Sequence, residues 1–153
     1  MSIDVKILEA SEPLNFNDLL NAVSRVDERC GAIVLFVGVV KGVVEGDKRV
    51  SELEYSAIKS TAIKVMERIA SEEARKYNLS HVTIWHRVGA LRPGEVTIVI
   101  AVSAENRKDA FRAAEEILER VKSEAPIFKL EKRSDGEFWI IGDGVRIKRT
   151  TLE

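Results

Sequence analysis

Two lysines seven residues apart, Lys122 and Lys129, carry the clearest potential for chemistry in this 153-residue chain. They lie in the segment VKSEAPIFKLEKRSDGEFW, on either side of Pro126. On a helical wheel of about 100° per residue, Lys122 lies at the edge of the apolar face of the helix before the proline. Arg107, at the start of that helix, also points to the apolar side. We therefore expect Arg107, Lys122 and Lys129 to meet where this helix ends and the next hairpin begins.

Such a cluster would attract an anion and would change the acidity of its own lysines. Each cation disfavours protonation of its neighbours, and partial burial acts in the same direction. A lysine there is therefore expected to titrate below its usual pKa of about 10.4, and a neutral amine is a nucleophile or a base. For each lysine alone a structural explanation stays open. Lys122 would then cover apolar surface with its long stem, and Lys129 would be a surface strand residue beside Glu131.

Three other residues have side chains with the potential for chemistry. His86 stands in the middle of the strand segment WHRVG, where a hydrogen-bonded structural histidine is favoured over an acid-base residue. His81 begins that strand and is expected to be exposed. The single cysteine, Cys30, precedes an apolar strand and is interpreted as a packed or boundary thiol rather than a nucleophile. No His, Cys or carboxylate spacing indicates a metal site, and no phosphate-binding glycine motif is present.

The composition bounds the class of protein. Hydrophobic residues make up 45% and charged residues 32%, as in a globular domain, and the length fits a single domain of residues 1–153 with a tail at 142–153. The 24 basic and 25 acidic residues nearly cancel, which argues against a nucleic acid as partner. The chain has no apolar run of membrane-spanning length, and its first residues lack the pattern of a signal peptide, so we expect a cytoplasmic protein without a membrane partner.

Hydrophobic periodicity predicts an α+β domain. We expect strands at residues 3–9, 31–41, 50–56, 81–89, 95–103, 127–132 and 138–142, and helices at residues 15–29, 58–77 and 107–124. The run at 31–41 is too continuously apolar to be half exposed, which predicts a central strand. Hairpins and three helices in this order favour two layers over a doubly wound parallel sheet.

Each predicted helix has an apolar face expected to point to the core. These faces comprise Leu19, Leu20, Val23 and Val26 in the first helix, Ala62, Met66, Ile69, Ala70, Ala74 and Tyr77 in the second, and Ala110, Phe111, Ala114, Ile117, Leu118 and Val121 in the third. The segment GVVEGDKR is expected to be a loop, and the tail has no strong pattern of its own. Its basic residues Arg146, Lys148 and Arg149 are interpreted as solvated, although a reach into a partner subunit's pocket stays open.

The series GAIVLFVGVVKG, VSELEYS, WHRVGALRPGEVTIVIAVSAENRKDAF, VKSEAPIFKLE and DGEFW resembles the large, catalytic subunit of molybdopterin synthase, the MoaE family, along nearly the whole chain. The resemblance implies an α/β hammerhead fold, an α+β domain with a mostly antiparallel sheet. It also implies a homodimer within a heterotetramer, in which each subunit binds a small ubiquitin-like sulfur carrier. The implied activity is that of a sulfurtransferase in molybdenum cofactor biosynthesis. The thiocarboxylate at the carrier's C-terminus delivers two sulfurs to cyclic pyranopterin monophosphate, without a further cofactor, to form the dithiolene of molybdopterin.

The resemblance also assigns roles to individual residues. It implies that Lys122 and Lys129 are catalytic. It implies that the substrate is bound by Val39, Val40, Lys41, Asn106, Arg107, Leu130 and Glu131. The chain departs from the family pattern at three positions, where Lys41 replaces arginine, Asn106 replaces histidine and Phe128 replaces tryptophan. Lys41 keeps the charge but loses the bidentate fork of arginine, and Asn106 can donate a hydrogen bond but cannot carry a proton. Because of these two changes a second reading stays open, a non-catalytic relative that binds the carrier or a pterin without turnover.

Overall fold

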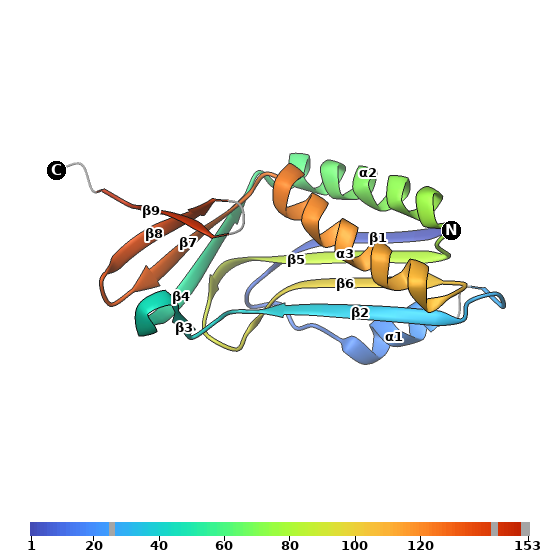
Figure 1. The fold of residues 1–153 in the computed structure, drawn as a ribbon, viewed down its shortest axis with the longest axis horizontal. Helices are drawn as coiled ribbons and strands as arrows, with labels where there is room; N and C mark the ends of the chain where they lie inside the picture. Colours follow the sequence, from blue (N-terminus) through green and yellow to red (C-terminus); the bar gives the residue numbers. More distant parts are fainter. Residues whose placement is uncertain (25–26, 142–143, 151–153) are drawn as a thin grey trace.

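The computed structural model describes residues 1–24, 27–141 and 144–150, which form a sheet of nine strands with three α-helices (Figure 1). The strands are β1 (Ser2–Glu9), β2 (Ala32–Val39), β3 (Val43–Val44), β4 (Lys48–Ala57), β5 (His81–Leu91), β6 (Val96–Ala104), β7 (Ile127–Arg133), β8 (Gly136–Ile141) and β9 (Val145–Lys148). The helices are α1 (Phe16–Ser24), α2 (Lys59–Tyr77) and α3 (Arg107–Glu124), with a single 3-10 turn at Glu45–Asp47 among the described residues.

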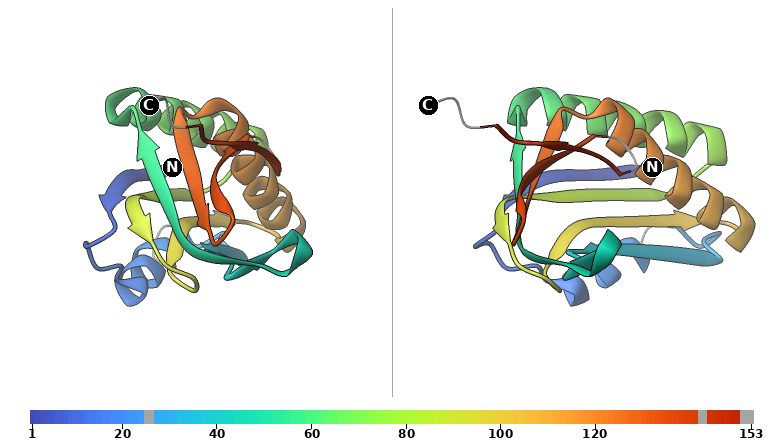
Figure 2. Two further views of the ribbon diagram at one scale, coloured as in Figure 1. Left: turned by 90° about the vertical axis from the view of Figure 1, so that its left-hand side faces the viewer. Right: turned by 60° about the vertical axis from the view of Figure 1, so that its left-hand side comes forward.

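The sheet has two parts that meet at β5. Its strand order is β2-β6-β5-β4-β7-β8-β9, with β1 beside β5 and β3 beside β4. Strand β1 runs parallel to β5, and the other pairs are antiparallel. The first residues of β5 pair with β6, whereas its last residues, from Gly89 to Leu91, pair with β4. The strands β4, β7, β8 and β9 therefore extend beyond the helix-covered part (Figure 2). The predicted α+β class, with a mostly antiparallel sheet, is confirmed.

Helices cover both faces of the first part of the sheet. Helices α2 and α3 lie side by side on one face, and α1 lies on the other (Figure 1). The large side chains fully buried under α2 and α3 include Met66, Ile69, Ile84, Ile100 and Ile117. A smaller cluster under α1 contains Leu19, Val23, Trp85, Val99 and Ala101. Removal of such apolar area from water stabilises the fold by about 1.5–3 kcal/mol per large side chain.

Local sequence determines where α3 begins and ends. The Asn106 side chain accepts a hydrogen bond from the backbone N–H of Asp109, at 3.0 Å, and so caps the first turn. At the other end, Pro126 has no backbone N–H and the chain becomes extended at Ala125. The observed bounds are those predicted from the sequence. Lys122 is thereby held in the last turn of the helix.

Strand β2 is an edge strand, so the prediction of a central strand at 31–41 is wrong. Within the described residues, β2 pairs with β6 and ends the sheet. Ile33, Leu35 and Val39 are exposed by 39%, 36% and 54%. A continuous apolar run resembles a central strand because both faces are apolar in either case. The sequence pattern does not distinguish burial by a neighbouring strand from an apolar edge.

Three details of the predicted helices also need correction. Phe111 is 64% exposed, and Ala113 takes its place in the buried face of α3. Leu20 is exposed on α1. Helix α1 is described over Phe16–Ser24, and residues 27–29 are not helical, so the predicted helix is too long at its end; Val26 lies outside the described residues.

His81 is buried, contrary to the expected exposure. Its ring hydrogen-bonds with the hydroxyl groups of Ser2 and Thr83, because β1 pairs in register beside the start of β5. The tail contains the strand β9, which pairs with β8, and the expected loop at 42–49 contains β3 and the 3-10 turn. Of the helices the structure describes, none has the length and apolar character required to cross a bilayer.

Candidate active site

A cavity of about 560 Å³ opens where the end of α3 faces the second part of the sheet. Its walls come from the end of β2, from β4, β5, β6 and β7, and from the C-terminal strand β9. The cations among its lining residues are Lys41, Lys122, Lys129 and Arg146. The volume lies within the range of small-ligand sites.

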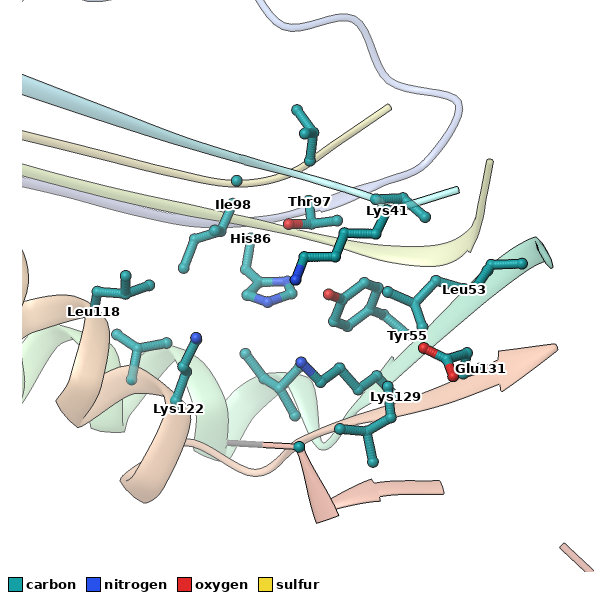
Figure 3. A pocket seen from close by; sticks show the side chains of 18 of the residues that line it. Lys41, Leu53, Tyr55, His86, Thr97, Ile98, Leu118, Lys122, Lys129 and Glu131 are labelled. Atoms are coloured by element: carbon teal, nitrogen blue, oxygen red, sulfur yellow. The ribbon is translucent and has the colours of Figure 1, made fainter. Parts of the chain in front are cut away.

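Lys122 and Lys129 both line this cavity, as the sequence predicted. Lys122 projects from the last turn of α3, beside Leu118. Lys129 lies on β7, directly opposite Tyr55 of β4. Figure 3 shows both amines directed into the space between the helix and the sheet. Pro126 ends α3 between them, so the chain turns and both amines face the same cavity.

The end of β2 and the two residues after it form a second wall. Val39, Val40 and Lys41 all line the cavity, as expected of the predicted substrate-binding residues. Lys41 is an exposed side chain whose amine points toward the ring of His86 (Figure 3). Three lysines from three separate elements therefore surround one space, which favours anionic ligands.

A polar floor of Tyr55, His86 and Thr97 lies between the lysines (Figure 3). The Nδ1–H of His86 donates a hydrogen bond to the carbonyl of Arg87, at 2.7 Å, because a carbonyl only accepts. In the neutral ring Nε2 then carries the lone pair. Burial lowers the pKa of His86 to about 4, and the charge of Lys129 acts in the same direction. Burial also raises the pKa of Tyr55, against a smaller opposing effect of its hydrogen bond with Thr97.

Glu131 is the carboxylate of the cavity, and two guanidinium groups surround it. Arg146 of β9 donates from Nε to Oε1 at 2.9 Å and from Nη2 to Oε2 at 3.3 Å. Arg133 lies 3.6 Å from Oε1. The hydrogen bond with Glu131 raises the pKa of Arg146. Arg146 therefore reaches the cavity of its own chain, which corrects the interpretation of this residue as part of a solvated tail.

Asn106 and Arg107 lie at the opposite end of α3 from Lys122. The helix separates Arg107 from Lys122 by about 22 Å, at about 1.5 Å per residue. The expected meeting of Arg107 with the two lysines is therefore wrong within one copy of the chain, and Asn106 serves as the cap of α3. Their contacts with substrate stay predictions.

Leu130 and Phe128 lie on the face of β7 that points away from the cavity. Both alternate with Lys129, and Leu130 is buried whereas Phe128 is exposed. The proposed substrate contact of Leu130 does not use its side chain in this arrangement. Three residues that line the cavity, Tyr55, Thr97 and Arg146, were absent from the predicted site. Of these, the sequence contains a pattern only for Tyr55, because the alternation of VSELEYS assigns each residue to one face of the strand.

The arrangement suits the binding of anions and the stabilisation of developing negative charge. Four cations face one carboxylate in a partly enclosed space, and fixed cations act more strongly there than in bulk water. Over residues 1–24, 27–141 and 144–150, no three His, Cys, Asp or Glu side chains are grouped to hold a metal ion.

Comparison with known proteins gives a consistent result. The family model described as MoaE protein matches residues 9–124. The molybdopterin synthase catalytic subunit of Pyrococcus abyssi is 39% identical over 146 residues, covering 95% of this chain and 97% of that protein. The subunit of the same description from Bacillus subtilis is 40% identical over 121 residues, covering 78% and 76%. A crystal structure of molybdopterin synthase from Staphylococcus aureus superposes with a TM-score of 0.77 at 34% identity, covering 87% of this chain and 93% of that one.

Proposed function

The chain belongs to the MoaE protein family, and from that membership we propose that it acts as the catalytic subunit of a molybdopterin synthase, a sulfurtransferase of molybdenum cofactor biosynthesis. The substrate is cyclic pyranopterin monophosphate, and the sulfur comes from the thiocarboxylate at the C-terminus of a small carrier subunit. The observation that carries the proposal is the convergence of Lys122 and Lys129 on one cation-rich cavity.

Both reactants are anions, which explains the need for fixed cations in the site. Negative charge grows on the acyl group of the carrier as it is attacked. The amines of Lys122 and Lys129 are placed to stabilise this charge in a partly enclosed space. The carrier supplies the sulfur, so the reaction needs no cysteine from this chain. Cys30 belongs to the segment before β2 and is not among the residues that line the cavity.

Three of the other predicted site residues, Val39, Val40 and Lys41, are assigned to the binding of the pterin phosphate. Lys41 contributes charge to the cavity, and Val39 and Val40 line it at the end of β2. The neutral His86 and the hydroxyl groups of Tyr55 and Thr97 provide hydrogen-bonding groups without adding charge. Assembly with the carrier as a heterotetramer around a homodimer, and a cytoplasmic location, stay predictions.

A reconstituted conversion assay tests the proposal. The purified chain is mixed with cyclic pyranopterin monophosphate and with carrier that ends in a thiocarboxylate, and molybdopterin is measured by mass spectrometry. We expect product with this carrier and none with a control carrier that ends in an ordinary carboxylate. A titration of carrier binding runs in parallel. Binding of the carrier without product would support the non-catalytic alternative.

A further inference from the structure

The C-terminal strand β9 brings a guanidinium group to the cavity. Arg146 lies opposite Ile140 of β8, and Ile140 lies opposite Lys129 of β7. Cross-strand partners project from the same face of a sheet, so Arg146 and Lys129 face the same space. Ile140 also packs against the apolar cluster of Val40, Leu53 and Leu91, and Val40 directly precedes Lys41. Arg146 therefore stands in the part of the cavity formed by Lys41 and Lys129.

The Arg146 guanidinium is held by one of its edges. Its Nε and Nη2 atoms bind the two oxygens of Glu131, whose side chain is only 4% exposed. Its Nη1 atom points away from this carboxylate and makes a long contact of 3.5 Å with the carbonyl of Gly144. The Arg146 side chain is 24% exposed. A buried carboxylate thus orients the guanidinium of an arginine that is partly exposed and lines the cavity.

Arg133 provides Glu131 with a second cation. It lies 3.6 Å from Oε1 of Glu131, binds both oxygens of Asp135 at 2.8 Å and stacks over the Phe138 ring at 3.7 Å. Arg133 is not among the lining residues of the cavity. Asp135 engages Arg133 through both of its oxygens, so Glu131 remains the bidentate partner of Arg146 and fixes the direction of its guanidinium.

We propose that Arg146 binds the phosphate of the pterin substrate and that Glu131 positions the Arg146 side chain for this contact. The inference rests on the proposed function and adds the residue that recognises the phosphate. The lysine amines are point charges, whereas a guanidinium offers parallel N–H groups that match the geometry of phosphate oxygens. Lys41 lacks this fork, and Arg146 supplies it from another strand in the same part of the cavity.

Binding of inorganic pyrophosphate to the intact chain, measured by calorimetry, tests the contact without turnover. We expect Arg146→Ala to weaken this binding about tenfold or more, as for loss of a hydrogen bond to a charged group. The matched control is Arg149→Ala, since Arg149 lies just past the same strand but pairs with Glu137 and is absent from the cavity lining. Equal pyrophosphate affinity in the two variants, or no measurable binding by the wild type, would overturn the assignment.

Steady-state turnover then separates the two anionic substrates. We expect Arg146→Ala to raise the KM for the pterin about tenfold, with kcat changed less than about threefold and the KM for the carrier unchanged. A rise in the KM for the carrier alone would contradict the phosphate contact and indicate the thiocarboxylate. Wild-type chain that binds pyrophosphate but makes no product would contradict the proposed function and leave the Arg146 assignment standing.

Two further variants isolate the positioning role of Glu131. Glu131→Gln should raise the KM for the pterin, and the double variant with Arg146→Ala should raise it no further than Arg146→Ala alone. Additive effects of the two substitutions would contradict the positioning role. Thermal unfolding of each variant monitors the fold. If Arg146→Ala does not fold, Arg146→Lys is the variant to test. It keeps the charge opposite Glu131 but loses the fork of the guanidinium. Wild-type pyrophosphate affinity in Arg146→Lys would overturn the assignment.

Discussion

The rings of Tyr55 and His86 meet edge to face on the floor of the cavity, with 4.9 Å between their centroids and 67° between their planes. This packing, together with the hydrogen bond from Nδ1 to the Arg87 carbonyl, holds His86 in one tautomer. Its pKa of about 4 keeps the ring neutral at physiological pH. The neutral His86 ring therefore adds no positive charge to the site, whose cations are the lysines and Arg146.

His86 makes the stability of the protein sensitive to acid. Its pKa in the folded state is about 4 and its unfolded value about 6.5, so the unfolded chain binds more protons between these values. Stability present above pH 6.5 is lost as the pH falls to 4, by about 3 kcal/mol over the whole window. Denaturant unfolding should show this slope in the wild type and a smaller slope in His86→Gln. A His86 ring signal that titrates near pH 6.5 by NMR would contradict the prediction.

The two cavity lysines should affect catalysis and leave the fold intact. Lys122→Ala and Lys129→Ala are each expected to lower kcat about 10²- to 10³-fold, the usual cost of removing one group that stabilises developing charge. Lys122 is exposed in the last turn of α3, so its removal should change the free energy of unfolding by less than about 0.5 kcal/mol. The control is Lys108→Ala in the first turn of the same helix. An undiminished rate for Lys122→Ala would remove this residue from the mechanism.

A buried carboxylate between α2 and α3 is expected to cost stability at neutral pH. Burial raises the pKa of Glu73, and its contact with Glu116 adds to this effect. The folded state then binds the proton more tightly than the unfolded chain, so the stabilisation present at acid pH is lost as the pH rises through the folded-state pKa. Glu73→Gln should therefore raise the free energy of unfolding at pH 7 by about 0.5–1 kcal/mol.

Arg120, the ion-pair partner of Glu73, keeps other carboxylate partners when Glu73 is replaced. Arg120 also pairs with Glu72 at 2.9 Å and with Glu124 at 2.7 Å, so it keeps two carboxylates in the variant. Glu72→Gln, at an exposed position of the same group, is the matched control and should have little effect. Denaturant unfolding at pH 5 and pH 7 measures both variants. A loss of more than about 1 kcal/mol in Glu73→Gln would mean that the ion pair outweighs the cost of burial.

Sequence patterns located the helices and the two lysines because the determining interactions are local. The cap at Asn106 and the stop at Pro126 define α3 within a few residues of its ends, and the turn after Pro126 brings Lys129 back toward Lys122. The error with Arg107 has a simple physical origin. A helical wheel gives the direction of a side chain around the axis but ignores its position along the axis.

The residues that the sequence patterns missed depend on pairing between distant segments. Arg146 reaches the cavity because β9 pairs with β8 and β8 with β7, and no periodicity in the tail encodes this register. His81 is buried because the N-terminal strand lies beside it. Phe111 was placed in the core because an apolar residue next to a buried helical face has the same spacing whether it is covered or exposed. The exposed Phe111 lies on α3, the helix that packs against the edge strand β2.

Self-association is expected to use the edge formed by β2. The outer edge of this strand has no partner strand among the described residues, and Ile33 and Leu35 are exposed along it. A long apolar edge promotes pairing with another chain unless it is covered, and a lysine is an effective block. Leu35→Lys should weaken the dimer about 10- to 100-fold, as for loss of one buried apolar side chain at the contact. Sedimentation velocity measures this, with Ile141→Lys on the exposed face of β8 as the control. If Ile141→Lys dissociated the dimer and Leu35→Lys did not, the dimer contact would lie on the second part of the sheet. It would then use the face opposite to that of Lys129 and Arg146.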